Sequence, residues 1–196
     1  VDTARALDLP RPWHLIAHSM GGCIGLRAAM DGLPVASCAF TGPMWGIRIA
    51  DPVRPAAWAI SRMSKSVGLG HLFAPGTGAD SYVASNAFDD NLLTTDTEQW
   101  DYMRRQVLAI PELQLGGPSL HWLHEALAET RRLARRPSPK QPCICYCGTN
   151  ERIVDVDRIL KAKKCCNACR LRCDVSFKFG CGGHRSSSFN RHLIGR

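Results

Sequence analysis

Residues 13–30 constrain the fold more than any other part of the chain. A short apolar stretch at residues 13–17 leads through a tight, glycine-containing turn at residues 18–22 into a run of small and apolar side chains at helical spacing, residues 23–30. A second apolar stretch follows at residues 35–40. A strand, a helix and a strand in this order predict a βαβ unit with a parallel sheet. We therefore predict an α/β fold.

The rest of the chain adds helices and two further strands. Gly and Pro residues separate three segments with helical spacing, which are residues 55–67, 96–110 and 119–136. Strand-like stretches at residues 143–147 and 175–179 flank a helical segment at 155–164. The alternate cysteines of the first stretch, Cys143, Cys145 and Cys147, are expected to act as small buried hydrophobes.

Ser19 lies in the turn where the first strand meets the helix. A serine on such a sharp turn has its hydroxyl raised above the sheet edge, and it needs small residues two positions before and after it, here Ala17 and Gly21. The Met20 N–H, at the positive end of the helix, would stabilise a tetrahedral oxyanion. A serine that only caps a buried helix is the alternative. The strand before, the helix after and the glycine pair Gly21-Gly22 favour a nucleophile, and the glycines would let the helix pack closely.

These residues carry a family resemblance. Residues 9–30, LPRPWHLIAHSMGGCIGLRAAM, resemble the nucleophile region of α/β-hydrolases, and the chain resembles bacterial lysophospholipases and, more distantly, monoacylglycerol lipases. The likeness continues through TGPMWGIRI (41–49), DNLLTTD (90–96), LGGPSLHWLHEAL (115–127) and GTNERIVD (148–155). Ala17 replaces the first glycine of the usual Gly-x-Ser-x-Gly pattern.

The resemblance implies a partial α/β-hydrolase fold, a parallel sheet with a helical cap insertion. It divides the chain into residues 1–43, the nucleophile half of the core; 44–139, the helical cap; and 140–196, the rest of the core with a divergent end. It also implies an esterase that cleaves carboxylic esters of lipids through a Ser–acid–His triad and an acyl-enzyme.

The same resemblance implies the other triad members. GTNE (148–151) matches a Gly-x-x-Asp pattern after the seventh strand of the family, with Glu151 in place of Asp, and Asp155 is the alternative acid. GGHR (182–185) follows the expected last strand and makes His184 the general base, in preference to His192 or His18. The carboxylate would orient the imidazole and stabilise it once it is charged.

The beginning of the chain departs from this family. The relatives have four strands before the nucleophile, and the loop after the third of them supplies a second oxyanion N–H, whereas Val1 precedes Ser19 by only 18 residues. Loss of one oxyanion donor costs on the order of 100-fold or more in rate. We therefore expect a truncated hydrolase whose own activity is weak or absent.

The end of the chain is basic and rich in cysteine. Residues 143–196 hold 11 Lys and Arg against 4 Asp and Glu, with eight of the ten cysteines. Cys166-x-x-Cys169 and Cys181-x-x-His184 have the spacing of a four-ligand zinc site, so a small basic zinc module that contacts nucleic acid or protein is the alternative function. No aromatic residue interleaves the cations of residues 161–172, which disfavours base stacking. We therefore expect no cofactor, no metal and no nucleic-acid partner.

The remaining expectations concern the substrate and its setting. The expected partner is a lipid ester, for which a membrane surface is one source. No uncharged run reaches the roughly 18 residues of a membrane-spanning helix, and no signal segment precedes the first strand, so we expect a cytoplasmic protein with peripheral membrane association as an option. Four arginines end the segment 119–136. We interpret them as a solvated helix end, and contact with phosphate headgroups is the alternative. The sequence leaves the oligomeric state open.

Overall fold

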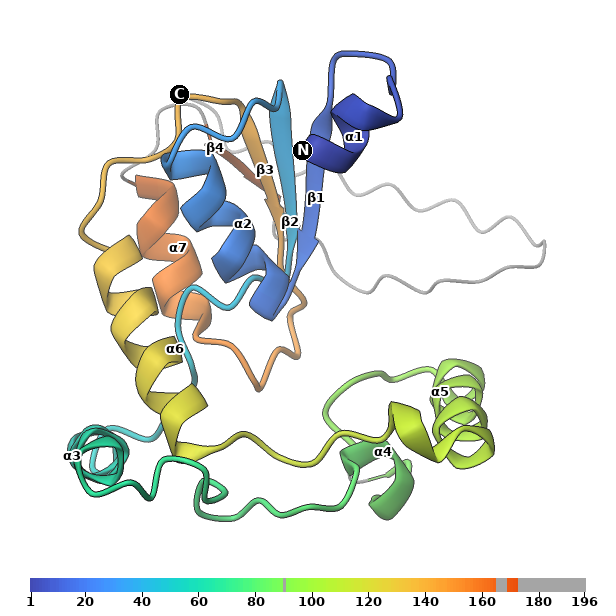
Figure 1. Cartoon of the computed structure of the whole chain (residues 1–196), viewed down its shortest axis with the longest axis vertical. Coiled ribbons are helices and arrows are strands. Elements are labelled where there is room, and N and C mark those ends of the chain that lie inside the picture. The colour runs from blue at the N-terminus through green and yellow to red at the C-terminus, as the bar shows by residue number, and fades with distance from the viewer. Residues whose placement is uncertain (90, 165–168, 173–196) are drawn as a thin grey trace.

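A parallel sheet forms the centre of the computed structural model, which describes residues 1–89, 91–164 and 169–172. In spatial order its strands are β1 (His14–His18), β2 (Ser37–Thr41), β3 (Cys143–Tyr146) and β4 (Cys169–Arg172). Every neighbouring pair is parallel (Figure 1). The predicted α/β fold is confirmed, and its first three strands are neighbours in the sheet. The structure has its fourth strand at β4, and the stretch predicted as a strand, 175–179, lies outside the described residues.

The helices of the described part follow the expected segments closely. They are α1 (Asp2–Ala6), α2 (Met20–Met30), α3 (Arg54–Ser66), α4 (Tyr82–Ser85), α5 (Thr97–Ala109), the 3-10 turn η1 (Pro111–Leu113), α6 (Leu120–Leu133) and α7 (Val156–Lys164). Helix α2 begins three residues earlier than predicted, because the glycine pair belongs to its first turn. The described chain has no helix long and apolar enough to cross a membrane.

The core lies between the sheet and three helices, α2, α6 and α7, which Figure 1 shows on one side of the strands. Phe40 and Cys145 on the central strands are fully buried, as is Ile159 of α7. The alternate cysteines of β3 are buried as predicted, and burial raises the pKa of the neighbouring Cys38 thiol. On the opposite face of the sheet, Ile16 of β1 is 80% exposed.

Ion pairs connect α2 to α6 and to the residues that follow it, at the edge of this core. Arg27 of α2 lies 2.7 Å from Glu129 of α6 and 2.6 Å from Asp31. Arg136, just after α6, lies 2.6 Å from the other oxygen of Asp31. Hydrogen bonds from Arg136 and then Arg27 hold the pKa of Asp31 below its ordinary value. Because Arg136 is paired, the arginine group that ends α6 is not uniformly solvated.

Helices α4 and α5 form a second, smaller cluster at a distance from the sheet (Figure 1). Trp100 of α5 is buried there, with its ring edge-to-face with those of Tyr82 and Phe88. The division of the chain at residues 43 and 139 stays a prediction. Helix α6, which lies within the predicted cap, also packs on the core, because Ala126 and Leu133 belong to the core cluster.

Candidate active site

Ser19 stands on a strained turn between β1 and α2. Its backbone has φ 50° and ψ −120°, a conformation that residues other than glycine rarely adopt. Three hydrogen bonds fix it: the Ser19 N–H donates to the Thr41 carbonyl at 3.1 Å, and the Ser19 carbonyl accepts from the N–H groups of Gly22 at 2.9 Å and Met44 at 2.8 Å. Strain of this kind costs about 1–3 kcal/mol and persists only where the surroundings enforce it, most often at functional sites.

The two glycines after the turn are not equivalent. A Cβ on Gly22 would lie 2.5 Å from Cβ and 2.8 Å from Cα of Pro43, so the loop after β2 packs directly on the α2 backbone. A Cβ on Gly21 would meet no described atom within 4 Å. The predicted close packing is therefore confirmed for Gly22, whereas Gly21 faces open space in the described chain.

Met20 begins α2 next to the serine, with a side chain that is 46% exposed. Its N–H donates to no group among the described residues, which leaves it available to an oxyanion at the positive end of the helix. The geometry suits the predicted oxyanion contact.

Glu151 follows β3, and so lies at the same edge of the parallel sheet as Ser19 after β1. Its Oε1 accepts hydrogen bonds from the N–H groups of Ile153 at 2.7 Å and Val154 at 3.1 Å. Its Oε2 lies against Gly42, the residue after β2, at 3.5 Å from the position of a Cβ there. The carboxylate is thus held by one oxygen, while Oε2 accepts no hydrogen bond from the described residues.

Asp155 is engaged in a different way. Its Oδ1 accepts from the N–H of Arg158 at 3.2 Å, in the first turn of α7, and its Oδ2 lies 3.7 Å from both Arg54 Nη2 and Arg158 Nε. An acid that caps a helix and pairs with two arginines has both oxygens occupied. Of the two acids that the sequence left open, the geometry favours Glu151 as the partner of a histidine.

The histidine is the member of the set that the described residues lack. His184 and His192 both lie outside them, so the general base stays a prediction. His18 is described, and its Nδ1 lies 2.8 Å from Oγ1 of Thr41. Of the zinc alternative's ligands, Cys166, Cys181 and His184 are likewise outside, and the described residues hold no cluster of three metal-ligating side chains.

The thiol of Cys23 lies near Ser19 but does not compete with it as a nucleophile, because it stays protonated. Cys23 is buried one turn further along α2. Burial, and secondarily the charge of Glu129, raises the pKa of its thiol to about 11. At neutral pH this thiol is protonated and unreactive, because the thiolate is the nucleophilic form.

Sequence reasoning missed the contacts that link the loops around this site. Arg48 donates a hydrogen bond to the Glu151 carbonyl at 3.3 Å. Asp155 and Arg158 pack closely on Gly46: a Cβ on this glycine would lie 2.9 Å from a side-chain atom of Asp155 and 2.8 Å from one of Arg158. The signal that could have indicated this is the glycine itself, since a glycine outside a turn often marks close approach of another segment.

Comparison with known proteins gives the family. Residues 1–177 match the family described as serine aminopeptidase, S33. The chain belongs to this family. The family match and the α/β-hydrolases among the similar structures confirm the resemblance to the α/β-hydrolases.

Individual relatives agree with this assignment. The chain is 29% identical to a probable lysophospholipase L2 of Haemophilus influenzae over 144 residues, 72% of this chain and 44% of that protein. Its fold matches a monoacylglycerol lipase of Paleococcus ferrophilus with a TM-score of 0.61 and 12% identity, over 89% of this chain and 62% of that one. Its fold also matches a soluble variant of the Saccharomyces cerevisiae monoglyceride lipase, with a TM-score of 0.59 and 18% identity, over 89% of this chain and 55% of that one. The chain thus spans about half the length of the relatives it matches.

Proposed function

We propose that this chain carries the catalytic serine of a hydrolase that cleaves carboxylic esters of single-chain lipids. The observation that carries the proposal is the strained, triply hydrogen-bonded turn that holds Ser19 at the carboxyl edge of the sheet. The carboxylate of Glu151 at the same edge supports it.

The proposed mechanism assigns one role to each residue. Oγ of Ser19 attacks the ester carbonyl while His184 takes its proton and then passes it to the leaving alcohol. Glu151 accepts a hydrogen bond from the other ring nitrogen through its available Oε2. The Met20 N–H donates to the oxyanion of the tetrahedral intermediate. Water then releases the fatty acid from the acyl-serine, with His184 as the base again.

Two observations support a lipid substrate. The relatives' names are those of a lysophospholipase and of monoacylglycerol lipases. In addition, Ile60, Met63 and Val67 project exposed apolar side chains at helical spacing along and just beyond α3. Such a stripe suits contact with an aggregated lipid surface. We therefore propose peripheral contact with lipid as part of this function.

Fatty acid release from a lysophosphatidylcholine and from a monoacylglycerol tests this proposal. We expect the chain to cleave these esters at the weak rate that the sequence predicts, to leave an aminoacyl anilide intact, and to keep its rate when a chelator is added. Cleavage of the anilide without cleavage of the esters would contradict the lipid assignment. Loss of structure after chelation, with about one zinc released per chain, would instead favour the zinc module at the C-terminal end.

A further inference from the structure

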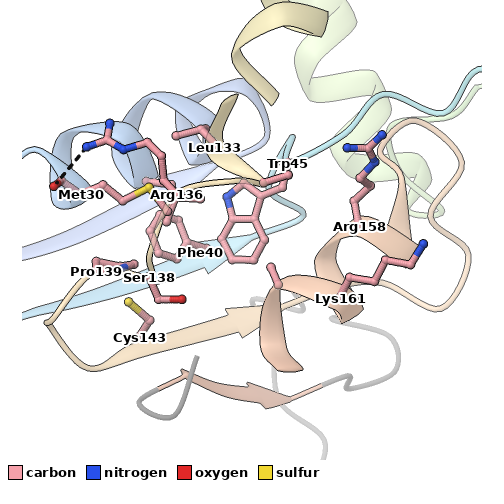
Figure 2. Close-up of a pocket in the computed structure, with 13 residues that line it drawn as sticks. Met30, Phe40, Trp45, Leu133, Arg136, Ser138, Pro139, Cys143, Arg158 and Lys161 are labelled. Atoms are coloured by element: carbon pink, nitrogen blue, oxygen red, sulfur yellow. Dashed lines mark hydrogen bonds between the residues drawn. The ribbon is translucent and has the colours of Figure 1, made fainter. Parts of the chain in front are cut away.

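A cavity of about 360 Å³ opens between the sheet and helices α2, α6 and α7. Its apolar walls are Leu26 and Met30 of α2, Phe40 of β2, Leu133 of α6 and Trp45, which follows β2. Figure 2 shows Trp45 and Phe40 at its centre, with Arg158 and Lys161 of α7 along one side. This volume lies within the range of about 300–1,000 Å³ that is usual for small-molecule sites.

A second pocket, of about 330 Å³, is lined by four arginines from three elements. They are Arg54 of α3, Arg131 and Arg135 at the end of α6, and Arg158 of α7. The carboxylate of Asp155 pairs with Arg54 and Arg158. Within the described chain Arg131 and Arg135 have no ion pair, and Arg131 lies over the Trp58 ring, 5.9 Å from its centre. Two arginines with unmatched charge facing one pocket predict an anion site.

The two pockets are neighbours that share the wall residues Ala134 and Arg158. Together they offer an apolar compartment beside a cationic one, which matches a molecule with one hydrocarbon chain and one anionic head. Arg forks bind phosphate through paired hydrogen bonds, so a phosphate monoester suits the cationic compartment better than a carboxylate of lower charge.

This double pocket is separate from the candidate active site. Neither compartment is lined by Ser19, Met20 or Glu151. Met30, in the apolar wall, lies at the far end of α2 from Ser19, roughly 16 Å along the helix. We propose that the double pocket binds a single-chain lipid phosphate, with the chain against Trp45 and the phosphate between Arg131 and Arg135, as a site beyond the hydrolytic one.

Titration calorimetry with dodecyl phosphate below its micelle concentration tests this proposal. The probe has no carboxylic ester, so hydrolysis cannot remove it, and Ser19→Ala should bind it as the unmodified chain does. We expect one molecule per chain and an affinity at least about tenfold above that for inorganic phosphate, because the hydrocarbon chain leaves water. The neutral dodecyl maltoside should bind at least about tenfold more weakly than the phosphate probe.

Variants separate the two compartments. Arg131→Gln combined with Arg135→Gln should weaken dodecyl phosphate binding at least about tenfold, since two charged hydrogen bonds are lost. Arg132→Gln is the matched control: this arginine is on the same turn, lies 3.5 Å from Glu129 and lines neither pocket, so the affinity should stay the same. Ala162→Leu narrows the apolar compartment and should weaken binding of dodecyl phosphate but not of inorganic phosphate.

Each other outcome overturns the proposal. If Arg132→Gln weakened dodecyl phosphate binding as much as the Arg131/Arg135 double variant does, the ligand would be held by nonspecific attraction to a basic helix end. Equal affinity for inorganic phosphate and dodecyl phosphate would mean a phosphate site without a lipid compartment. Undiminished binding to the Arg131/Arg135 double variant would place the ligand elsewhere. Because binding is measured in the Ser19→Ala chain as well, failure here is distinct from failure of the proposed hydrolase function.

Discussion

Glu151→Gln is expected to slow acylation of Ser19 by roughly 10⁴-fold, the scale of loss when a triad carboxylate becomes an amide. The amide keeps the size of the side chain but offers an N–H₂ group where the histidine needs an acceptor. In the unmodified chain Oε1 of Glu151 is held by two backbone N–H groups, whereas Oε2 accepts no hydrogen bond from the described residues. The rate of reaction with an activated acyl ester measures the effect.

Asp155→Asn is the matched control for this prediction. It removes the same charge from an acid four residues away, whose oxygens cap α7 and pair with Arg54 and Arg158. We expect a lower free energy of unfolding and an acylation rate close to that of the unmodified chain. The reverse pattern, with acylation lost in Asp155→Asn and kept in Glu151→Gln, would make Asp155 the acid of the triad.

Gly22→Ala is expected to destabilise the chain by about 1–3 kcal/mol or more, as overpacking does in a close-packed interior. The added methyl group would lie 2.8 Å from the Cα of Pro43, so no side-chain rotation can relieve the contact. Moving Pro43 would also disturb the Met44 N–H that fixes the Ser19 carbonyl. Urea unfolding gives the change in free energy, and the acylation rate should fall with it.

Gly21→Ala tests whether the effect is specific to that contact. The methyl group at this neighbouring position of α2 meets no described atom within 4 Å. Alanine in a helix is better than glycine by about 0.5–1 kcal/mol, so we expect this variant to be slightly more stable. Equal destabilisation by the two substitutions would contradict the account of how the turn packs.

The fold was predictable where local pattern and burial coincide. The apolar stretches around Ile16, Ala39 and Ile144 are short and bounded by turn residues, so they are recognisable as strands, and the parallel pairing of the first two follows from the βαβ order. The family resemblance, not the periodicity, supplied Glu151. The structure adds an argument for Glu151 over Asp155 that the sequence could not supply, because the partners of Asp155 include Arg54, far away in the sequence.

The cationic pocket was beyond sequence reasoning for the same reason. The arginines that end α6 form an obvious group in the sequence, but a group at a helix end is usually solvated. The structure divides that group: Arg136 pairs with Asp31 and Arg132 with Glu129, whereas the exposed Arg131 and Arg135 line the same pocket as Arg54 and Arg158. Such a division depends on how α3 and α7 pack, which no local pattern encodes.

Mapping where a fluorophosphonate binds shows whether Ser19 is an activated nucleophile. We expect one adduct per chain, on the peptide that contains Ser19, and no adduct in Ser19→Ala. Mass spectrometry of the digested protein reads this result directly. An adduct on a different serine, or labelling that persists in Ser19→Ala, would contradict the claim.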